Sequence, residues 1–309
     1  MWSPRASAHQ PHSVVNLSAI RRPRQPNLAL SSRFGILDRV TSQLAVLKPS
    51  SLTDWLLEHG RHFVTTPEIA ELLGVSATSV PVTLHRARTA NKIVSVTKGA
   101  WVPVPPAHRS AGAPPPVQFI DELMNHLGHP YYIGFLSAAR IHGASHQVPM
   151  SLQVVTPAHL RDRRIGDHPV RFIRRSATAE RATERRQTET GSLNVSTPET
   201  TVFDLVDAPG QGAGLGNVAN VMGELVLDGR LDPQLLTDVA KQYPLAVTQR
   251  AGWILEHMAD QVGGHIDLEA LHHAVSDAAT TPLDPELPRV GDRDPRWRVC
   301  VNTDLEHDL

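Results

Sequence analysis

The sequence predicts an α+β fold in two parts, a small helical part with a hairpin at residues 50–106 and a larger mixed α/β domain at residues 118–309. Three observations lead to this prediction. Capped helices followed by two alternating strands occupy residues 51–104. A Pro/Ala-rich stretch, typical of a semi-rigid linker, separates the parts, and we place this linker at 107–117. Helix-like and strand-like apolar patterns then continue to the C-terminus.

The first part opens with a helix that carries Leu52 and Leu56 at helical spacing. A second helix is expected after a short β-like run, because Thr65 precedes Glu68 by three residues, which is the spacing of a capping box. This helix should end at Gly74, the residue type that most easily adopts the left-handed conformation of a helix C-cap.

A third helix follows, and its apolar residues predict the side that faces the core. Val80, Leu84 and Ala87 recur at positions i, i+4 and i+7, so they should share one buried face. The opposite face then carries Ser79, Thr83 and Arg86.

Two alternating strands at residues 93–96 and 100–104, joined by Thr97-Lys98-Gly99, predict a hairpin. Helix cap, glycine turn, third helix and hairpin in this order predict a winged helix-turn-helix, a fold used most often to bind duplex DNA. The alternative is a small helical domain with a solvated basic face. In the DNA-binding interpretation, residues near base edges are Ser79, Thr83 and Arg86, and residues near phosphates are His85, Arg88, Lys92 and Lys98.

One such domain reads few base pairs, so operator DNA with inverted repeats is expected, bound by two protomers or by two cooperating domains. Self-association on DNA would follow from that arrangement.

Composition sets looser bounds. The chain has 309 residues, 40% hydrophobic and 20% charged, with a formal net charge of −1, which is ordinary for a soluble globular protein and unlike a whole-surface nucleic-acid binder. Residues 1–49 carry seven Lys or Arg against the single acid Asp38, and we expect a basic, disordered extension; a phosphate-binding arm is the alternative. No stretch has the length of a membrane span or a signal-peptide core, so a cytoplasmic protein is expected. The single cysteine, Cys300, excludes a disulfide framework.

The second part is predicted to begin with two helices, followed by strands and then mainly helices. Helices are expected around residues 119–127 and 134–143, strands at 152–155, 170–173 and 193–195, a helix opened by Thr197-Pro198-Glu199, further helices near 216–228, 233–241, 246–261 and 267–276, and a last strand with Trp297, Val299 and Val301.

Four phrases of this second part carry a family resemblance. They are Tyr132–Gly143 (YIGFLSAARIHG), Ser196–Leu205 (STPETTVFDL), Gln249–Glu256 (QRAGWILE) and Arg296–Asn302 (RWRVCVN). In this order behind a winged helix, the chain resembles the AbiEi-type antitoxins of type IV toxin-antitoxin systems, over nearly all of residues 50–309. The resemblance implies an N-terminal DNA-binding domain that represses its own operon and a C-terminal domain that neutralises a nucleotidyltransferase-like toxin. It leaves open whether neutralisation needs direct contact.

Two other functions compete with this interpretation, a ligand-sensing transcriptional regulator and a metal-dependent nucleic-acid enzyme. For the enzyme, Glu199, Asp204 and Asp207 lie on or near one helix and could hold Mg²⁺, but no lysine accompanies them. The glycines at 212–216 could cradle phosphate, although they follow a helix rather than a strand. The histidines His126, His129, His142 and His146 match no common zinc spacing. We therefore expect no catalytic residues, no metal and no cofactor.

An arginine-rich stretch runs through residues 161–186 and is interrupted by acids. A solvated surface whose charges pair with one another is one interpretation, and a face for an acidic protein or nucleic acid is the other.

Overall fold

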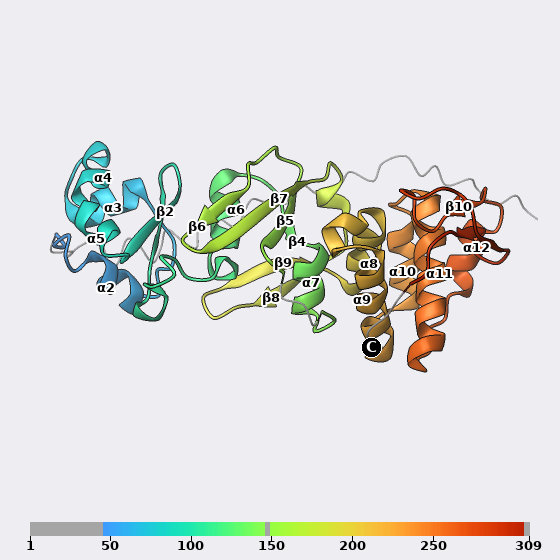
Figure 1. Cartoon of the computed structure of the whole chain (residues 1–309). Helices are drawn as coiled ribbons and strands as arrows, with labels where there is room; N and C mark the ends of the chain where they lie inside the picture. The colour runs from blue at the N-terminus through green and yellow to red at the C-terminus, as the bar shows by residue number, and fades with distance from the viewer. Residues whose placement is uncertain (1–45, 146–148, 306–309) are drawn as a thin grey trace, which may run out of the picture. The chain divides into compact units, whose positions relative to one another are not determined.

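The computed structural model describes residues 46–145 and 149–305 (Figure 1). Helices and several sheets share these residues, so the predicted α+β class is confirmed. Of the predicted basic extension, only residues 46–49 lie within the described part of the chain.

The first part has its elements in the predicted order. Two helices are separated by a short strand, and a third helical segment precedes a hairpin. The elements are α2 (Leu52–Glu58), β1 (Val64–Thr65), α3 (Thr66–Leu73), the third helical segment η2 (Ala77–Ser79), α4 (Val80–Thr83) and α5 (His85–Thr89), and the hairpin β2 (Ile93–Thr97) and β3 (Ala100–Pro103).

Local chemistry explains both ends of α3. At its start, the Glu68 carboxylate accepts a hydrogen bond from the Thr65 backbone N–H at 2.7 Å, as the capping-box spacing predicts. At its end, Gly74 has a φ of +61°, which a residue with a Cβ adopts only at a cost. The chain can therefore turn sharply into the third helical segment.

A small core holds this first part together. Strand β3 pairs with both β1 and β2 in antiparallel fashion, and the resulting sheet lies against the helices. Leu52, Ile69 and Leu84 are fully buried there with Trp101 of β3. The Trp101 indole N–H donates to the Thr66 hydroxyl at 2.8 Å, which satisfies the polar atom of this large side chain.

The other face of the hairpin belongs to a second core. Because side chains alternate along a strand, Ala100 and Val102 point away from Trp101, and they pack in one cluster with Phe119 and Ile120. The intervening segment, predicted as a linker, contains η3 (Pro106–His108) and η4 (Pro116–Gln118). Its Ala113 is fully buried.

A six-stranded mixed sheet forms the centre of the second part. Its order is β6-β7-β5-β4-β9-β8, with β7 parallel to β5, β4 parallel to β9 and the other neighbours antiparallel. The elements of this region are α6 (Ile120–Leu127), β4 (Tyr132–Ile133), α7 (Phe135–Ile141), β5 (Leu152–Thr156), β6 (Arg163–Ile165), β7 (His168–Arg174), η5 (Thr178–Glu180), β8 (Thr183–Gln187) and β9 (Ser192–Ser196).

Both faces of this sheet are buried. Ile133 and Val154 lie in the core that contains α6 and the hairpin, whereas their neighbours Tyr132 and Val155 lie in the core built by the later helices. Successive residues of the same strands thus hold two different cores.

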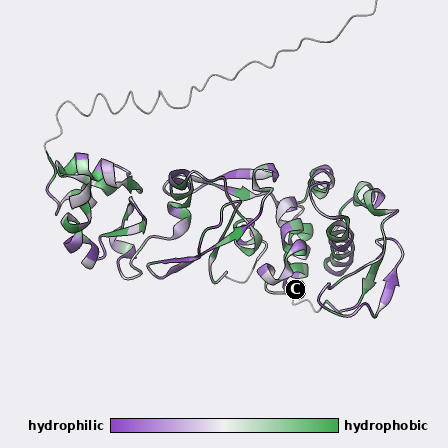
Figure 2. Ribbon diagram, turned by 90° about the horizontal axis from the view of Figure 1, so that it is seen from above, coloured by the Kyte–Doolittle hydropathy of each residue, from purple (hydrophilic) through white to green (hydrophobic). Residues whose placement is uncertain are grey.

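Helices and a three-stranded sheet complete the chain. The helices carry hydrophobic and hydrophilic stretches in alternation (Figure 2), as expected for helices with one buried side. The elements are α8 (Pro198–Asp207), η6 (Pro209–Gly212), α9 (Leu215–Leu227), α10 (Pro233–Ala240), α11 (Leu245–Val262), α12 (Glu269–Val275), β10 (Thr281–Pro282), β11 (Asp292–Asp294) and β12 (Val299–Val301). None of the described helices combines the length and apolar character needed to cross a bilayer.

The two edge strands of the large sheet, β6 and β8, were not among the predicted strands. Strand β8 has the sequence TERRQ and contains no apolar residue. An edge strand tolerates such a sequence, because it is solvated and its backbone pairs on one side only. Charged residues there also discourage pairing with another chain.

Candidate nucleic-acid interface

The third helical segment presents one buried side and one exposed side. Val80 and Leu84 are fully buried, and Ala87 packs partly buried against the same core, as the spacing predicts. Ser79 and Arg86 are exposed on the outer side.

The charged residues in the stretch of sequence that contains this segment have one sign. Residues 72–120 contain no Asp or Glu. They carry Arg86, Arg88, Lys92, Lys98 and Arg109, of which Arg109 forms an ion pair with Asp54 at 4.0 Å. Such a stretch gives a locally positive surface in a chain whose net charge is near zero, and a positive surface attracts a polyanion such as a DNA backbone.

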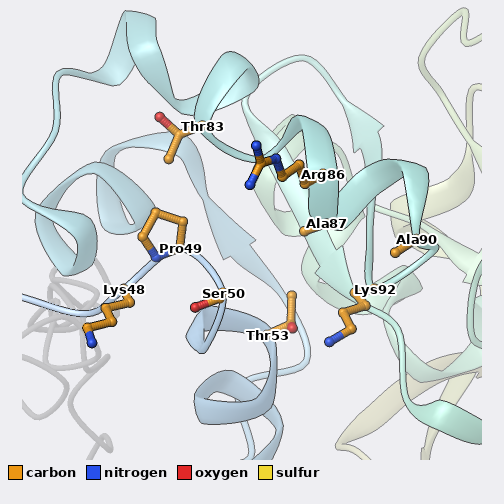
Figure 3. A pocket seen from close by; sticks show the side chains of 9 residues that line it. All are labelled: Lys48, Pro49, Ser50, Thr53, Thr83, Arg86, Ala87, Ala90 and Lys92. Carbon is orange, nitrogen blue, oxygen red and sulfur yellow. The ribbon is translucent and has the colours of Figure 1, made fainter.

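The structure divides the predicted contact residues between two flanks of the segment. Thr83, Arg86 and Lys92 line one pocket together with Lys48 (Figure 3). His85 and Arg88 line a separate hollow together with Ser95 of the hairpin, and Lys98 is exposed at the hairpin turn.

Three of the predicted residues have their side-chain groups engaged within the fold. The Ser79 hydroxyl shares a hydrogen bond with the Ser76 hydroxyl at 2.7 Å. The Thr83 hydroxyl donates to the Ser79 carbonyl at 2.9 Å, so it is bonded to its own helix. The Arg88 guanidinium lies 5.7 Å from the centre of the Trp101 ring, in the range of a cation–π contact.

Sequence reasoning did not identify two kinds of residue at this surface. Val82 is 78% exposed between the predicted Ser79 and Arg86. An apolar residue outside the buried stripe of a helix is the signal that could have marked it. Lys48 and Ser50, just before α2, and Thr53 in its first turn also line the pocket. No sequence pattern indicates that this end of α2 approaches the third segment.

The carboxylates that could have suggested an enzyme are used in the fold. Asp204 is 1% exposed and accepts hydrogen bonds from the Tyr132 hydroxyl at 2.8 Å and the Tyr243 hydroxyl at 2.9 Å. Burial raises the pKa of Asp204, and burial together with the neighbouring Asp204 raises the pKa of both tyrosines. Asp207 forms an ion pair with Arg175. Glu199 is also buried, and one of its oxygens accepts from the Asp232 N–H at 2.8 Å.

The candidate metal ligands are not brought together. His126 and His129 are exposed, whereas His142 is buried and its Nε2 lies 2.8 Å from the Ser196 carbonyl. Burial lowers the pKa of His142. His146 lies outside the described residues. Within residues 46–145 and 149–305, no group of three or more His, Cys, Asp or Glu is arranged to hold a metal ion.

The glycine-rich segment that could have cradled phosphate is partly a packing feature. Gly212 is buried, and a Cβ at this position would overlap side-chain atoms of Val218 and Leu205.

Most of the arginines in the stretch 161–186 have partners within the fold. Arg185 binds Asp121, Arg186 binds Glu184, and Arg175 binds Asp207. The Arg163 guanidinium donates to the Val96 carbonyl at 3.0 Å. These contacts support the interpretation of a surface that is largely self-paired.

The family-like phrases meet in space as structural networks. From α11, Gln249 Nε2 donates to the Trp297 carbonyl at 3.2 Å, and Glu256 accepts from the Trp297 indole N–H at 2.6 Å. Gly252 lies between them, directly under the Trp297 ring, so a Cβ there would overlap the ring carbons. The phrases at Gln249–Glu256 and Arg296–Asn302 thus describe one packed joint.

A known protein family matches most of the second part. Residues 132–257 match the model of a family described as the AbiEi antitoxin C-terminal domain. This segment of the chain is therefore similar to the AbiEi antitoxin C-terminal domain, which confirms the resemblance to AbiEi-type antitoxins.

One solved structure shows how far the fold extends. The chain is similar to the crystal structure of the RV2827C protein from Mycobacterium tuberculosis, with a TM-score of 0.56 and 16% sequence identity over 84% of this chain and 92% of that chain. At this identity the likeness concerns the fold alone. No curated protein matches the chain.

The Trp297 joint yields a stability prediction. Gly252→Ala should destabilise the protein, because overpacking a close contact costs roughly 1–3 kcal/mol and exceeds the roughly 1 kcal/mol gained from higher helix propensity. Gly210→Ala is the matched control, since a Cβ at Gly210 meets nothing within 4 Å. Thermal melting of both variants checks the prediction. An unchanged melting temperature for Gly252→Ala would contradict the role given to this contact.

Proposed function

We propose that this protein is an antitoxin that represses its own operon through residues 50–106 and counteracts a nucleotidyltransferase-like toxin through residues 118–309. The observation that supports it most strongly is the AbiEi antitoxin C-terminal domain at residues 132–257. The family implies a toxin as partner. The acid-free stretch of residues 72–120, with Arg86, Arg88 and Lys98 exposed, supports DNA as the second partner.

The first part acts as a winged helix in this proposal. The third helical segment would enter the major groove, and the hairpin β2–β3 would be the wing. Its turn carries the exposed Lys98 beside Gly99, whose φ of +81° suits a tight turn. Two protomers on inverted repeats would supply the specificity that one short helix lacks.

The structure favours a particular division between base and phosphate contacts. Val82 lies on the outer side of the segment, where its isopropyl group can contact a thymine methyl group. Ser79 lies on the same side, with its hydroxyl bonded to that of Ser76. Of the remaining predicted residues, His85, Arg88, Lys92 and Lys98 suit phosphates. Thr83 has its hydroxyl bonded within the helix, so it is less suited to base readout than the sequence indicates.

Neutralisation in this proposal is stoichiometric or regulatory rather than catalytic. The three carboxylates considered for Mg²⁺, Glu199, Asp204 and Asp207, are buried or paired. Their contacts in the described second part are therefore structural. A Mg²⁺-dependent turnover that accounts for protection would favour the enzyme alternative instead.

The base-reading role of Val82 can be measured with modified operator DNA. Replacing a contacted thymine by deoxyuridine removes one methyl group, and loss of its burial should cost about 0.8 kcal/mol, or about fourfold in affinity. The effect should appear at one position per half-site in the wild type and disappear in Val82→Ala. Fluorescence anisotropy with singly substituted duplexes measures it. If every thymine position is insensitive while the operator still binds tightly, Val82 does not read a base.

The division of labour between the two parts can be tested in cells. Val82→Asp places a carboxylate on the proposed DNA face, so it should abolish operator binding while leaving the fold intact. Val290→Asp is the matched control, because Val290 is 79% exposed in the second part and should leave DNA binding unchanged. Expressed from a foreign promoter, Val82→Asp should still protect cells from the cognate toxin. Loss of protection by a Val82→Asp protein with normal melting behaviour would contradict the proposal.

A further inference from the structure

The pocket between α2 and the third helical segment has the chemistry of an anion site (Figure 3). The pocket is open to solvent and has a volume of about 560 Å³, and three cationic residues from separate elements line it. Lys48 precedes α2, Arg86 belongs to α5, and Lys92 lies just before β2. No carboxylate lines the pocket, and none of these three side chains takes part in an ion pair with another described residue.

A buried hydroxyl in the same pocket lacks a partner. Thr53 is 1% exposed, and its Oγ1 has no hydrogen-bond partner among the described residues. A helical threonine can satisfy its hydroxyl with a carbonyl one turn back, as Thr83 does. A buried hydroxyl without a hydrogen bond is unfavourable. An unpaired hydroxyl in a pocket lined by three cationic residues therefore points to a ligand that accepts hydrogen bonds.

We propose that this pocket binds a phosphate group, held by Lys48, Arg86 and Lys92 and by the Thr53 hydroxyl. A phosphate offers several acceptor oxygens and a negative charge in a small tetrahedral volume, which suits a pocket lined by cations and hydroxyls from separate elements. The planar guanidinium of Arg86 can bind two of those oxygens at once. Ser50, also at the pocket, supplies a further hydroxyl.

The phosphate has two possible sources, a phosphodiester of the DNA strand or a free phosphorylated molecule. With the first source, the inference rests on the proposed DNA binding and assigns Arg86 to the backbone rather than to a guanine. With the second, the pocket is an effector site beside the DNA-contacting surface. Both sources present the same phosphate chemistry. Substitutions in the pocket should change DNA affinity if the phosphate belongs to DNA, and thermal stabilisation by phosphate if it is free.

The test uses the full-length protein with Thr53→Val and Arg86→Gln. Thr53→Val keeps the side-chain shape and removes only the unpaired hydroxyl, so the unliganded variant should melt at or above the wild-type temperature. Arg161→Gln is the control for Arg86→Gln, because it removes the same charge from an exposed side chain outside the pocket.

The DNA arm measures affinity for operator and unrelated duplexes over a range of salt concentrations. For a DNA phosphate, Arg86→Gln should weaken both duplexes by a similar factor, on the order of tenfold, and should lower the salt slope by about one unit. A single methylphosphonate in each half-site should then abolish the effect of Thr53→Val, because both changes remove the same contact.

The second arm measures thermal stabilisation by inorganic phosphate against chloride at equal ionic strength. For a free phosphate, stabilisation should be saturable in the wild type and in Arg161→Gln, and should be lost in Thr53→Val and Arg86→Gln, with DNA affinity unchanged by Thr53→Val.

The proposed pocket is overturned if neither arm separates Thr53→Val and Arg86→Gln from Arg161→Gln. It is also overturned if Arg86→Gln weakens binding only where one particular base pair is present, because that result makes Arg86 a base contact while DNA binding itself stands. A wild-type protein that binds no duplex but shows saturable, Thr53-dependent phosphate stabilisation would overturn the proposed DNA binding and leave the pocket standing.

Discussion

The alternation of side chains across strands connects the two parts of this protein. In the large sheet, Val154 and Val155 are adjacent in the chain and lie in different cores. The hairpin β2–β3 repeats the arrangement, since Trp101 packs on the first helices and Val102 packs on the core that includes Phe119. The hairpin thus lies between two cores.

The residues that carry the family resemblance are mainly structural. Tyr132 and Asp204 come from different phrases and form a buried hydrogen bond. Gly252 and Trp297 also come from different phrases, and they pack directly against each other. Motifs of this kind identify the fold, because burying a polar group or a close backbone contact constrains residue type strongly. Partner specificity then depends on exposed residues, where such constraints are weaker.

Sequence reasoning located what local physics determines and missed what tertiary contacts determine. The cap at Thr65, the turn at Gly74 and the buried face of Val80 and Leu84 follow from local spacing, and the structure has them. The edge strands β6 and β8 carry little or no apolar alternation, so their pairing depends on neighbours that are distant in sequence. The pocket was missed for the same reason, because Thr53 lies about thirty residues before Thr83 and nothing local brings α2 to the third segment.

We propose that the first part binds DNA and that residues 118–309 remain free for another partner. Hydrogen–deuterium exchange of the full-length protein, with and without operator DNA, tests this directly. We expect slower exchange on DNA binding at residues 76–99 and around residues 48–53. The exchange rates of residues 132–257, including strands β6 and β8, should not change. Slower exchange confined to the arginine-bearing strands β6 and β8, with residues 76–99 unaffected, would contradict it.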